Sequence, residues 1–487
     1  MKKAIAVIAA AVLSLTLFAG CGEHEEIVNK PITYESLMAK FEGEPERNVT
    51  LKILDNDTAV EEGYFDELIA AFNAEYAEYG IKAEDANMSQ YTDLETNGPL
   101  GYGPDVLYNA NDVIMRYAEN GHVLPLPTEK LDTYGEGKLD ESVSDTFSMN
   151  RYDMDLQFGV PINVQTLVLF YRADKFADQP DTDGNGTPDV LESYASLYEY
   201  SKEVRATSTN DNPVYGYVHS LNNEYFNSGF LFSYGAYIFG DTTDDIGFAN
   251  GEAYKGLRVM QDLASVMDSD AASDAYTVQA YNALASGKYL ATITTPDVYV
   301  KFLNALADEY ERTEGISESA AMNKARENLK VADVPALPES GDLDDADSAT
   351  FEMTTMGGVN GYAISSYTKA PKASLLFVDF ASKYEQVVKR ASMLGVVPAR
   401  KDAAEADDTN AYSEMVYTRV EAGRVTMMPS VRALTFIWPS VGSMFALVAN
   451  DVTITGKGQP SAYKTDESLK KLLTDTVSDI KRAMEIG

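Results

Sequence analysis

The spacing of apolar residues predicts that strands and helices alternate in the first third of the chain. Residues 49–54 alternate between apolar and polar side chains, as a strand with one buried face does. Apolar residues from Phe65 to Tyr76 then recur at helical spacing, and Gly80 ends this predicted helix. Residues 81–83 and 104–108 are the next predicted strands. This alternation is typical of an α/β fold with a parallel sheet.

The same alternation restarts further along the chain. The elements predicted there are a strand at 164–171, a helix at 191–204, a strand at 214–218, helices at 253–266 and 280–286, a strand at 289–294 and an amphipathic helix at 305–330. Two such sets predict two α/β lobes. Proteins built in this way bind their ligands in the crevice between the lobes.

The N-terminus has the pattern of a secretory signal peptide over residues 1–20. Lys2 and Lys3 precede an apolar run that is too short to span a membrane and ends in small residues. Cys21 directly follows Ala-Gly, which resembles the bacterial lipoprotein signal and predicts a lipid anchor on this thiol. The alternative is a free thiol behind an ordinary signal peptide. Residues 21–47 are polar and acidic and are predicted to be a flexible tether.

Composition and charge narrow the class of partner. The 487 residues carry a formal charge of −37, so their field repels phosphate backbones and makes nucleic acid an unsuitable partner. A neutral or cationic small molecule is favoured instead. Cys21 is the only cysteine, so the protein relies on its hydrophobic core and not on disulfides. We expect a monomer on the outer face of the cell membrane, attached only through the lipid.

Residues 181–192 match the twelve-residue calcium-binding loop at each ligand position. The predicted Ca²⁺ ligands, with Thr187 contributing its carbonyl, are Asp181, Asp183, Asn185, Thr187, Asp189 and Glu192. Gly186 occupies the sixth position, where the loop turns sharply. The alternative is an acidic, glycine-rich turn that caps the following helix. Because no second loop of this kind occurs, we expect a structural site and not a paired regulatory one.

The sequence gives little support for catalysis. The three histidines are scattered, and the His-Glu-x-x-His, Gly-x-Ser-x-Gly and phosphate-binding glycine motifs are absent. A glycosidase needs only two carboxylates, so an extracellular carbohydrate-active enzyme stays an alternative. A calcium-dependent surface adhesin would explain the lipid and the calcium but not the two lobes.

Five segments, in order, resemble the family 1 extracellular solute-binding proteins of ABC importers. They are residues 103–121, 160–171, 280–296, 357–365, and Met428-Pro429 followed by Trp438. The resemblance covers the chain from about residue 48 to its end. It implies two discontinuous α/β lobes joined by a hinge, with the ligand in the cleft between them, and the permease subunits of an ABC importer as partner. Maltooligosaccharides are the expected ligands, because the segments are most similar to maltodextrin-binding members.

The resemblance also implies where the lobes begin and end. The first lobe would comprise residues 48–160 and 362–405, and the second residues 161–361 and 406–487. The chain would cross between them near Pro161, near Asn360 and at residues 400–412.

The residues that match the family's ligand groups, together with tyrosines near them, are candidates for contacting the sugar. They are Asp55, Asp57, Tyr64, Asn109, Asn111, Asp112, Gln165, Asn223, Glu224, Tyr225, Asp297, Tyr299, Asn360, Tyr362 and Trp438. Gln165 stands where the family often has a carboxylate, and Asp297 stands where a Trp is expected. Trp438 is the only tryptophan, and its alternative role is to anchor the core.

Overall fold

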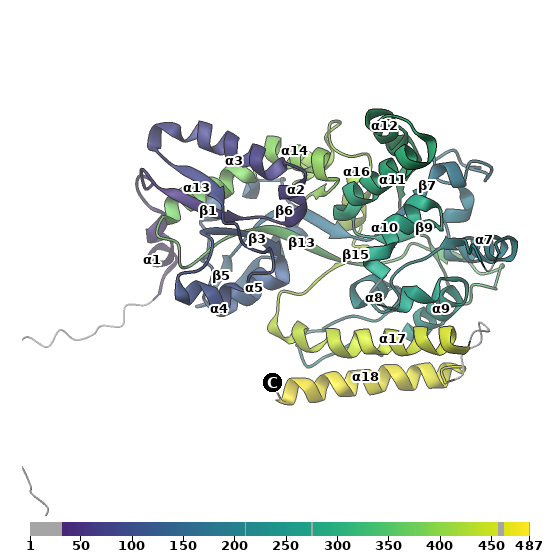
Figure 1. Ribbon diagram of the computed structural model, residues 1–487. Helices are drawn as coiled ribbons and strands as arrows, with labels where there is room; N and C mark the ends of the chain where they lie inside the picture. Colours follow the sequence, from purple (N-terminus) through teal and green to yellow (C-terminus); the bar gives the residue numbers. More distant parts are fainter. Residues whose placement is uncertain (1–31, 210, 274–275, 456–461, 487) are drawn as a thin grey trace, which may run out of the picture.

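The computed structural model describes residues 32–209, 211–273, 276–455 and 462–486. Two lobes lie side by side, and strands pass between them at the middle of the molecule (Figure 1). The predicted signal peptide and Cys21 lie outside the described residues.

The first lobe is built on a mixed seven-stranded sheet. Its order is β14 (Val397–Pro398), β6 (Val160–Thr166), β13 (Thr355–Ile364), β3 (Val106–Ala110), β1 (Thr50–Leu54) and β2 (Lys82–Asp85), with β15 (Val425–Met427) also beside β13. The first three strands in the sequence are parallel, as predicted. β13 is antiparallel to both β3 and β6, so the sheet is not purely parallel.

Helices cover both faces of this sheet. They are α2 (Asp57–Glu61), α3 (Tyr64–Glu75), α4 (Leu94–Asn97), α5 (Asn111–Glu119), α6 (Glu141–Asp145), α13 (Pro371–Ala381), α14 (Tyr384–Leu394), α15 (Lys401–Ala404) and α16 (Ser413–Glu421). α3 buries the apolar stripe seen in the sequence, and the ring of Phe72 packs edge-on against Phe377 of α13 at 5.1 Å. Short strands β4 (Ser148–Arg151) and β5 (Met154–Gln157) form a hairpin beside it.

The second lobe has a four-stranded sheet in the order β10 (Leu329–Ala332), β7 (Val168–Arg172), β9 (Tyr289–Thr294) and β8 (Tyr215–Tyr217). Its helices are α7 (Tyr194–Thr207), α8 (Glu224–Phe232), α9 (Ala253–Val266), α10 (Tyr276–Ser286), α11 (Tyr299–Glu314), α12 (Glu318–Asn328), α17 (Trp438–Thr455) and α18 (Asp466–Ile486). Alternate residues of β7 enter two different cores. Leu169 packs among the second-lobe helices, whereas Phe170 joins a core that is continuous with that of the first lobe.

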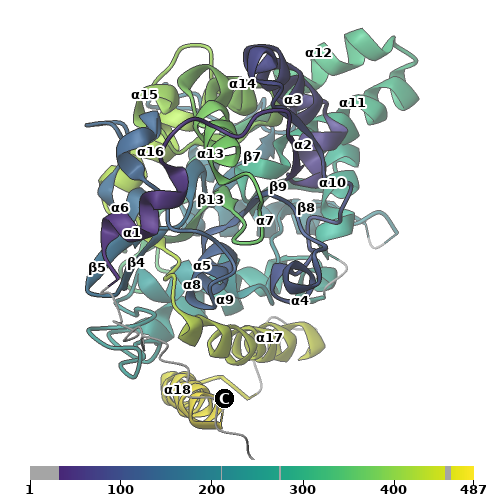
Figure 2. The same ribbon diagram turned by 90° about the vertical axis from the view of Figure 1, so that its left-hand side faces the viewer.

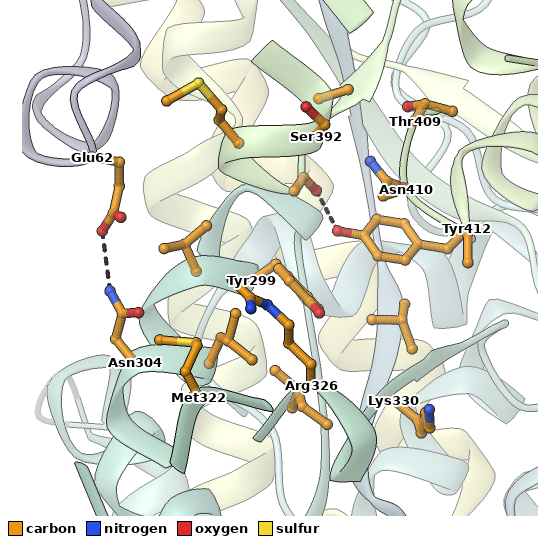
Figure 3. Close-up of a pocket in the computed structure, with 18 residues that line it drawn as sticks. Glu62, Tyr299, Asn304, Met322, Arg326, Lys330, Ser392, Thr409, Asn410 and Tyr412 are labelled. Carbon is orange, nitrogen blue, oxygen red and sulfur yellow. Dashed lines mark hydrogen bonds between the residues drawn. The ribbon is translucent and has the colours of Figure 1, made fainter. Parts of the chain in front are cut away.

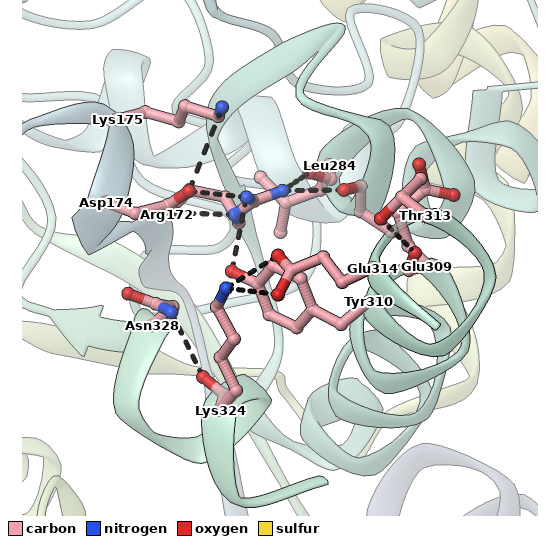
Figure 4. A network of polar contacts seen from close by, with 11 residues as sticks. Arg172, Asp174, Lys175, Leu284, Glu309, Tyr310, Thr313, Glu314, Lys324 and Asn328 are labelled. Atoms are coloured by element: carbon pink, nitrogen blue, oxygen red, sulfur yellow. Dashed lines mark hydrogen bonds and ion pairs between the residues drawn. The ribbon is translucent and has the colours of Figure 1, made fainter. Parts of the chain in front are cut away.

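The amphipathic stretch predicted as one helix at 305–330 forms two. α11 ends at Gly315, whose φ of 66° is left-handed, and the Ser317 side chain caps α12. Figure 4 shows how this helical hairpin is held to the sheet. Arg172 of β7 makes a two-pronged ion pair with Asp174 and also donates to Leu284 O and to the Tyr310 hydroxyl of α11.

The crossings between the lobes differ from the predicted positions: the first and third lie later in the chain, and the return lies earlier than Asn360. β6 belongs wholly to the first sheet, so the chain first crosses at Leu167, between β6 and β7, and not at Pro161. It returns before Thr355, where β13 begins. The third crossing follows β15, because α15, α16 and β15 pack on first-lobe strands and residues 400–412 therefore stay in that lobe.

The prediction that residues 21–47 form a flexible tether is wrong for residues 32–47. A short helix, α1 (Tyr34–Met38), begins with Thr33 as its cap, and Met38 and Phe41 are buried in the first-lobe core. The Glu46 carboxylate accepts a 2.8 Å bond from the backbone of Ala373 at the start of α13. This segment is therefore part of the lobe.

One apolar stretch of the described chain, residues 432–452, is long and apolar enough to cross a membrane, with a mean hydropathy of 1.4. It contains most of α17, which packs against α8, α9 and α18. Figure 2 shows α17 and α18 lying together along one side of the molecule. Val441, Met444 and Phe445 are buried there, so the apolar composition serves the core of the second lobe.

Candidate functional site

Residues from both lobes meet around the hydroxyl group of Tyr225. Tyr225 lies in the first turn of α8, and its hydroxyl donates to the Gln165 carbonyl of β6 at 3.2 Å. The backbone of β13 approaches from the other side: a Cβ built on Gly358 would lie 4.0 Å from this hydroxyl and 3.3 Å from Asn111 Oδ1. Gln165, Asn111 and Tyr225, all predicted from the sequence, are therefore neighbours.

Two carboxyl groups, one from each lobe, act on the same hydroxyl. Burial raises the pKa of Tyr225, and the charges of Asp297 and Asp112 raise it further. Asp112 lies in the first turn of α5, and Asp297 lies in a short 3₁₀ turn, Pro296–Val298, after β9. Burial raises the pKa of each carboxyl group as well. The site is thus acidic and partly shielded from water.

Glu224 and Trp438 lie on the second-lobe side of the site. Burial raises the pKa of the Glu224 carboxyl group, which faces α17: a Cβ on Gly442 would lie 3.1 Å from Glu224 Oε2. Trp438 is half-buried and packs against the same core as Tyr225. Asn223 caps α8 by accepting a 3.0 Å bond from the backbone of Phe226. That Trp438 and Asn223 touch the ligand stays a prediction.

Asn111 holds the chain segments of the site together. Its amide donates to Met428 O and Ser430 Oγ, both at 3.0 Å, and its Oδ1 accepts from the backbone of Val359 at 3.1 Å. These bonds join α5, β13 and the segment after β15. The side chain is fully buried, so its hydrogen bonds are already committed to the protein.

The other two asparagines lie in strands of the first sheet. Asn109 is half-buried, and its Oδ1 accepts from the backbone of Ala110 at 2.9 Å. Asn360 is 8% exposed in β13 and lies opposite Ala110 and Asn163.

The prediction that Asp55, Tyr64 and Tyr362 line the cleft is wrong. Asp55 forms an ion pair with Arg390 of α14, with Oδ1 2.8 Å from Nη2, and it also accepts from the Tyr362 hydroxyl. Tyr64 donates to Gln386 O at 3.2 Å, and its ring faces the Arg390 guanidinium. All four side chains are buried inside the first lobe. Asp55 is committed to Arg390 there, because an unpaired buried arginine would be very costly.

Asp57 and Tyr299 keep at least part of their surface accessible. Asp57 is exposed in the first turn of α2, and its backbone donates to Gln90 Oε1 at 3.2 Å. Tyr299 packs against Tyr412 with the ring centroids 5.8 Å apart. Both positions are compatible with the predicted role, which stays a prediction.

Tyr299 also lines a pocket of about 470 Å³ between the lobes, which the sequence did not reveal (Figure 3). Glu62 directly after α2, the end of α14 and the start of α11 surround it, together with Arg326 of α12. Asn304 of α11 donates to Glu62 Oε1 at 3.1 Å, a hydrogen bond that joins the two lobes. No sequence motif marks this pocket, because its lining comes from five separated segments.

Arg419 is a second feature that the sequence did not reveal. This buried side chain of α16 donates to Leu167 O and Met353 O at 3.1 Å and to Thr355 Oγ1 at 3.0 Å, and it pairs with Asp333 at 3.0 Å. Leu167 and Met353 lie at two crossings between the lobes. Arg419 therefore holds the hinge segments, and only its place among apolar residues of a helix could have drawn attention to it.

The loop at 181–192 folds back on its own carboxylates. Asp181 accepts from the backbones of Gly184 and Gly186 at 2.8 and 3.0 Å. The Asn185 amide donates to Asp183 at 3.0 Å and to Glu192 at 2.8 Å. Among the described residues, no group of three or more His, Cys, Asp or Glu is gathered as a ready metal site. Of the side chains predicted to bind Ca²⁺, Asp183, Asn185 and Glu192 contact one another, whereas the Asp181 and Asp189 carboxylates accept from the loop backbone.

Comparison with known proteins identifies the family. Residues 67–416 match the sequence model of the bacterial extracellular solute-binding proteins. The maltodextrin-binding protein MdxE of Bacillus subtilis is 23% identical over 469 residues, which cover 91% of this chain and 92% of that protein. A galactooligosaccharide-binding protein of the same organism is 26% identical over 405 residues, with 80% and 82% covered.

Solved structures show the same fold. A maltose-binding periplasmic protein MalE of Listeria monocytogenes superposes with a TM-score of 0.65 at 20% identity, covering 90% of this chain and 98% of the other. MalX of Streptococcus pneumoniae gives 0.65 at 19% identity, covering 89% and 99%. With its two hinged lobes and its match over residues 67–416, this chain belongs to the bacterial extracellular solute-binding proteins, a family of binding proteins and not of enzymes.

Proposed function

We propose that this protein captures an oligosaccharide outside the cell and delivers it to an ABC importer, with maltooligosaccharides as the first ligands to test. The observation that carries the proposal is the meeting of Gln165 and Asp112 with Tyr225 and Asp297 from the opposite lobe. Carboxylates and amides accept and donate to sugar hydroxyls, and tyrosine and tryptophan offer flat faces to sugar rings. The names of the related proteins, which include maltodextrin and galactooligosaccharide binders, support this ligand class.

Titrating the single tryptophan's fluorescence with a panel of oligosaccharides tests the proposal directly. We expect a saturable change with one class of sugar and no consumption of the sugar, with calorimetry giving the same affinity. Tyr225→Phe removes only the hydroxyl group at the centre of the site and should weaken binding. Tyr237→Phe is the matched control, because the Tyr237 hydroxyl bonds to Asp245 on the surface. A folded protein that gives no heat with any oligosaccharide would exclude this function.

The proposed location is the outer face of the membrane, through a lipid on Cys21. The family is extracellular, and two related proteins of Streptococcus pneumoniae are named as solute-binding lipoproteins. Cys21→Ser should release the protein from the membrane fraction into the medium. Retention of that variant on the membrane would contradict the anchor. The permease partner and the monomeric state are part of the same proposal.

We also propose that the loop at 181–192 binds one Ca²⁺ as a structural clip. The support is the matching ligand order, together with the hydrogen bonds that bring Asp183 and Glu192 to the Asn185 amide. Binding at 100 times the dissociation constant would raise the free energy of unfolding by about 2.7 kcal/mol.

Calorimetry with Ca²⁺ after chelator treatment checks this proposal. Bound Ca²⁺ should raise the melting temperature of the wild-type protein, and Glu192→Gln should abolish both the binding and this rise. Asp178→Asn, an exposed change just before the loop, should leave both unchanged. A chelated protein that shows no heat with millimolar Ca²⁺ would leave the loop as an acidic turn.

A further inference from the structure

Asp297 has a buried carboxylate oxygen without a hydrogen-bond partner at the junction of the lobes. Among the residues that the structure describes, no donor is hydrogen-bonded to its Oδ1, which is buried. Its other interactions are with the neighbouring Thr295 side chain and with its own backbone. Buried carboxylates are almost always paired, and an unpaired one is costly. This oxygen therefore needs a donor that the protein itself does not supply.

The charge of this carboxylate raises the pKa of four tyrosines, and in the described part of the chain none of them is hydrogen-bonded to its Oδ1. The charge of Asp297 acts on Tyr108 of the first sheet, on Tyr225 and Tyr281 of the second lobe, and on Tyr412 beside α16. Tyr108 donates instead to Asn163 Oδ1, Tyr225 to Gln165 O and Tyr412 to Gly395 O. Donors are thus close by, but three of the four are committed elsewhere.

The charged groups around Asp297 do not neutralise it. Lys301, one turn later on α11, is exposed, and its charge is the weakest of the influences on this carboxyl group. Arg390, which faces Tyr108, is paired with Asp55. Asp112, whose charge acts on Tyr225 together with that of Asp297, is itself acidic and offers no compensation. Closing the lobes without a ligand therefore places the Oδ1 atom of this carboxylate where neither water nor a protein donor satisfies it.

We propose that Asp297 couples closure of the lobes to the arrival of a ligand that donates a hydroxyl hydrogen bond. In the empty protein, the charged carboxylate opposes closure, because closure removes its water. A sugar hydroxyl bound at Oδ1 replaces that water and removes the opposition. The inference rests on the proposed function for the identity of the ligand, but its effect on the empty protein does not depend on any sugar.

The experiment measures lobe closure in the absence of ligand. Fluorescent labels on Asp66→Cys of α3 and Glu318→Cys of α12, in the full chain with Cys21→Ser, report the distance between the lobes. Both positions are exposed and lie on opposite lobes. We expect Asp297→Asn and Asp297→Ala to raise the ratio of closed to open protein about tenfold at pH 7. Asp308→Asn, which removes an exposed charge from α11, should not change this ratio.

Acidification provides a second readout. Burial raises the pKa of Asp297, so lowering the pH from neutral should close the empty wild-type protein more than it closes Asp297→Asn. Asp112 and Glu224 also have raised pKa values, but their protonation affects closure equally in the wild type and in Asp297→Asn. An unchanged distance in both Asp297 variants at pH 7, with circular dichroism showing native folding, would overturn the proposal. Failure of wild-type protein to close with any oligosaccharide would instead count against the proposed function.

Discussion

The ion pair between Asp55 and Arg390 joins residues 335 positions apart in the interior of the first lobe. Both side chains are essentially inaccessible to water, and the Arg390 guanidinium lies over the rings of Tyr64 and Tyr108. A buried pair of this kind contributes little to the free energy of unfolding when it is compared with apolar residues of the same size. Removing one member, however, leaves the other as an uncompensated buried charge.

We therefore expect Asp55→Asn to lower the free energy of unfolding by about 3–5 kcal/mol. Urea denaturation followed by circular dichroism measures this. Asp57→Asn, two residues later and exposed, should change stability by less than about 0.5 kcal/mol. A small effect of Asp55→Asn together with a lost affinity for sugar would reinstate Asp55 as a ligand contact.

A buried histidine makes the stability sensitive to acid. Burial lowers the pKa of His219 to about 4, although its Nε2 lies 2.8 Å from Asn227 Oδ1. The unfolded chain binds this proton near pH 6.5, so the contribution of His219 is complete above that pH and is lost as the pH falls to about 4. The loss should approach about 3 kcal/mol. Urea unfolding of the wild type and of His219→Gln from pH 7 to 4 measures it, and equal slopes for the two proteins would contradict this prediction.

At the residue scale, the sequence predicted the neighbourhood of the site better than the exposure of its members. Asp112, Gln165, Tyr225 and Asp297 do come together, because each lies near the start or the end of an element at the junction of the lobes. Asp55 and Tyr362 match the expected positions equally well but face inward. Their partner, Arg390, lies in a distant helix, and a pattern of nearby residues carries no information about such pairing.

At the scale of elements, Arg419 shows how one helix controls the connections between lobes. Lysine at this position keeps the charge but not the planar fork that reaches Leu167 O, Met353 O and Thr355 together. We expect Arg419→Lys to reduce the free energy of unfolding by about 2 kcal/mol or more and to change the affinity for the ligand. Arg424→Lys is the control, because Arg424 forms only an exposed pair with Glu352. Equal effects of the two changes would show that Arg419 has no special role in the hinge.

Helices and strands were predicted with the right bounds where a single hydrophobic periodicity covers a single helix or strand. The helix at 253–266 and the strand at 289–294 have the predicted bounds. Residues 164–171 form one continuous β-prone run, and that pattern does not show that the chain leaves one sheet at Leu167 and enters another. Likewise, the amphipathic pattern of 305–330 continues through Gly315, where α11 ends. Sheet membership depends on partners far away in sequence, which periodicity does not report.

At the scale of the whole molecule, the charge of −37 acts against compactness. Salt shortens the range of this repulsion to about 10 Å at 0.1 M and about 3 Å at 1 M. We therefore expect the melting temperature, measured by calorimetry in the presence of a chelator, to rise by several degrees between 20 mM and 0.5 M NaCl. An unchanged or falling melting temperature would show that surface ion pairs outweigh the net repulsion.

The position of β13 in the first sheet has a consequence for how the chain folds as it is made. β13 lies between β6 and β3, and residues 355–364 are separated from β3 by more than half of the chain. A chain that emerges N-terminus first holds β1, β2 and β3 without their central partner until β13 follows. The first lobe therefore completes its sheet only after the polypeptide of the second lobe has largely emerged, so synthesis cannot finish and fold the first lobe before it makes most of the second.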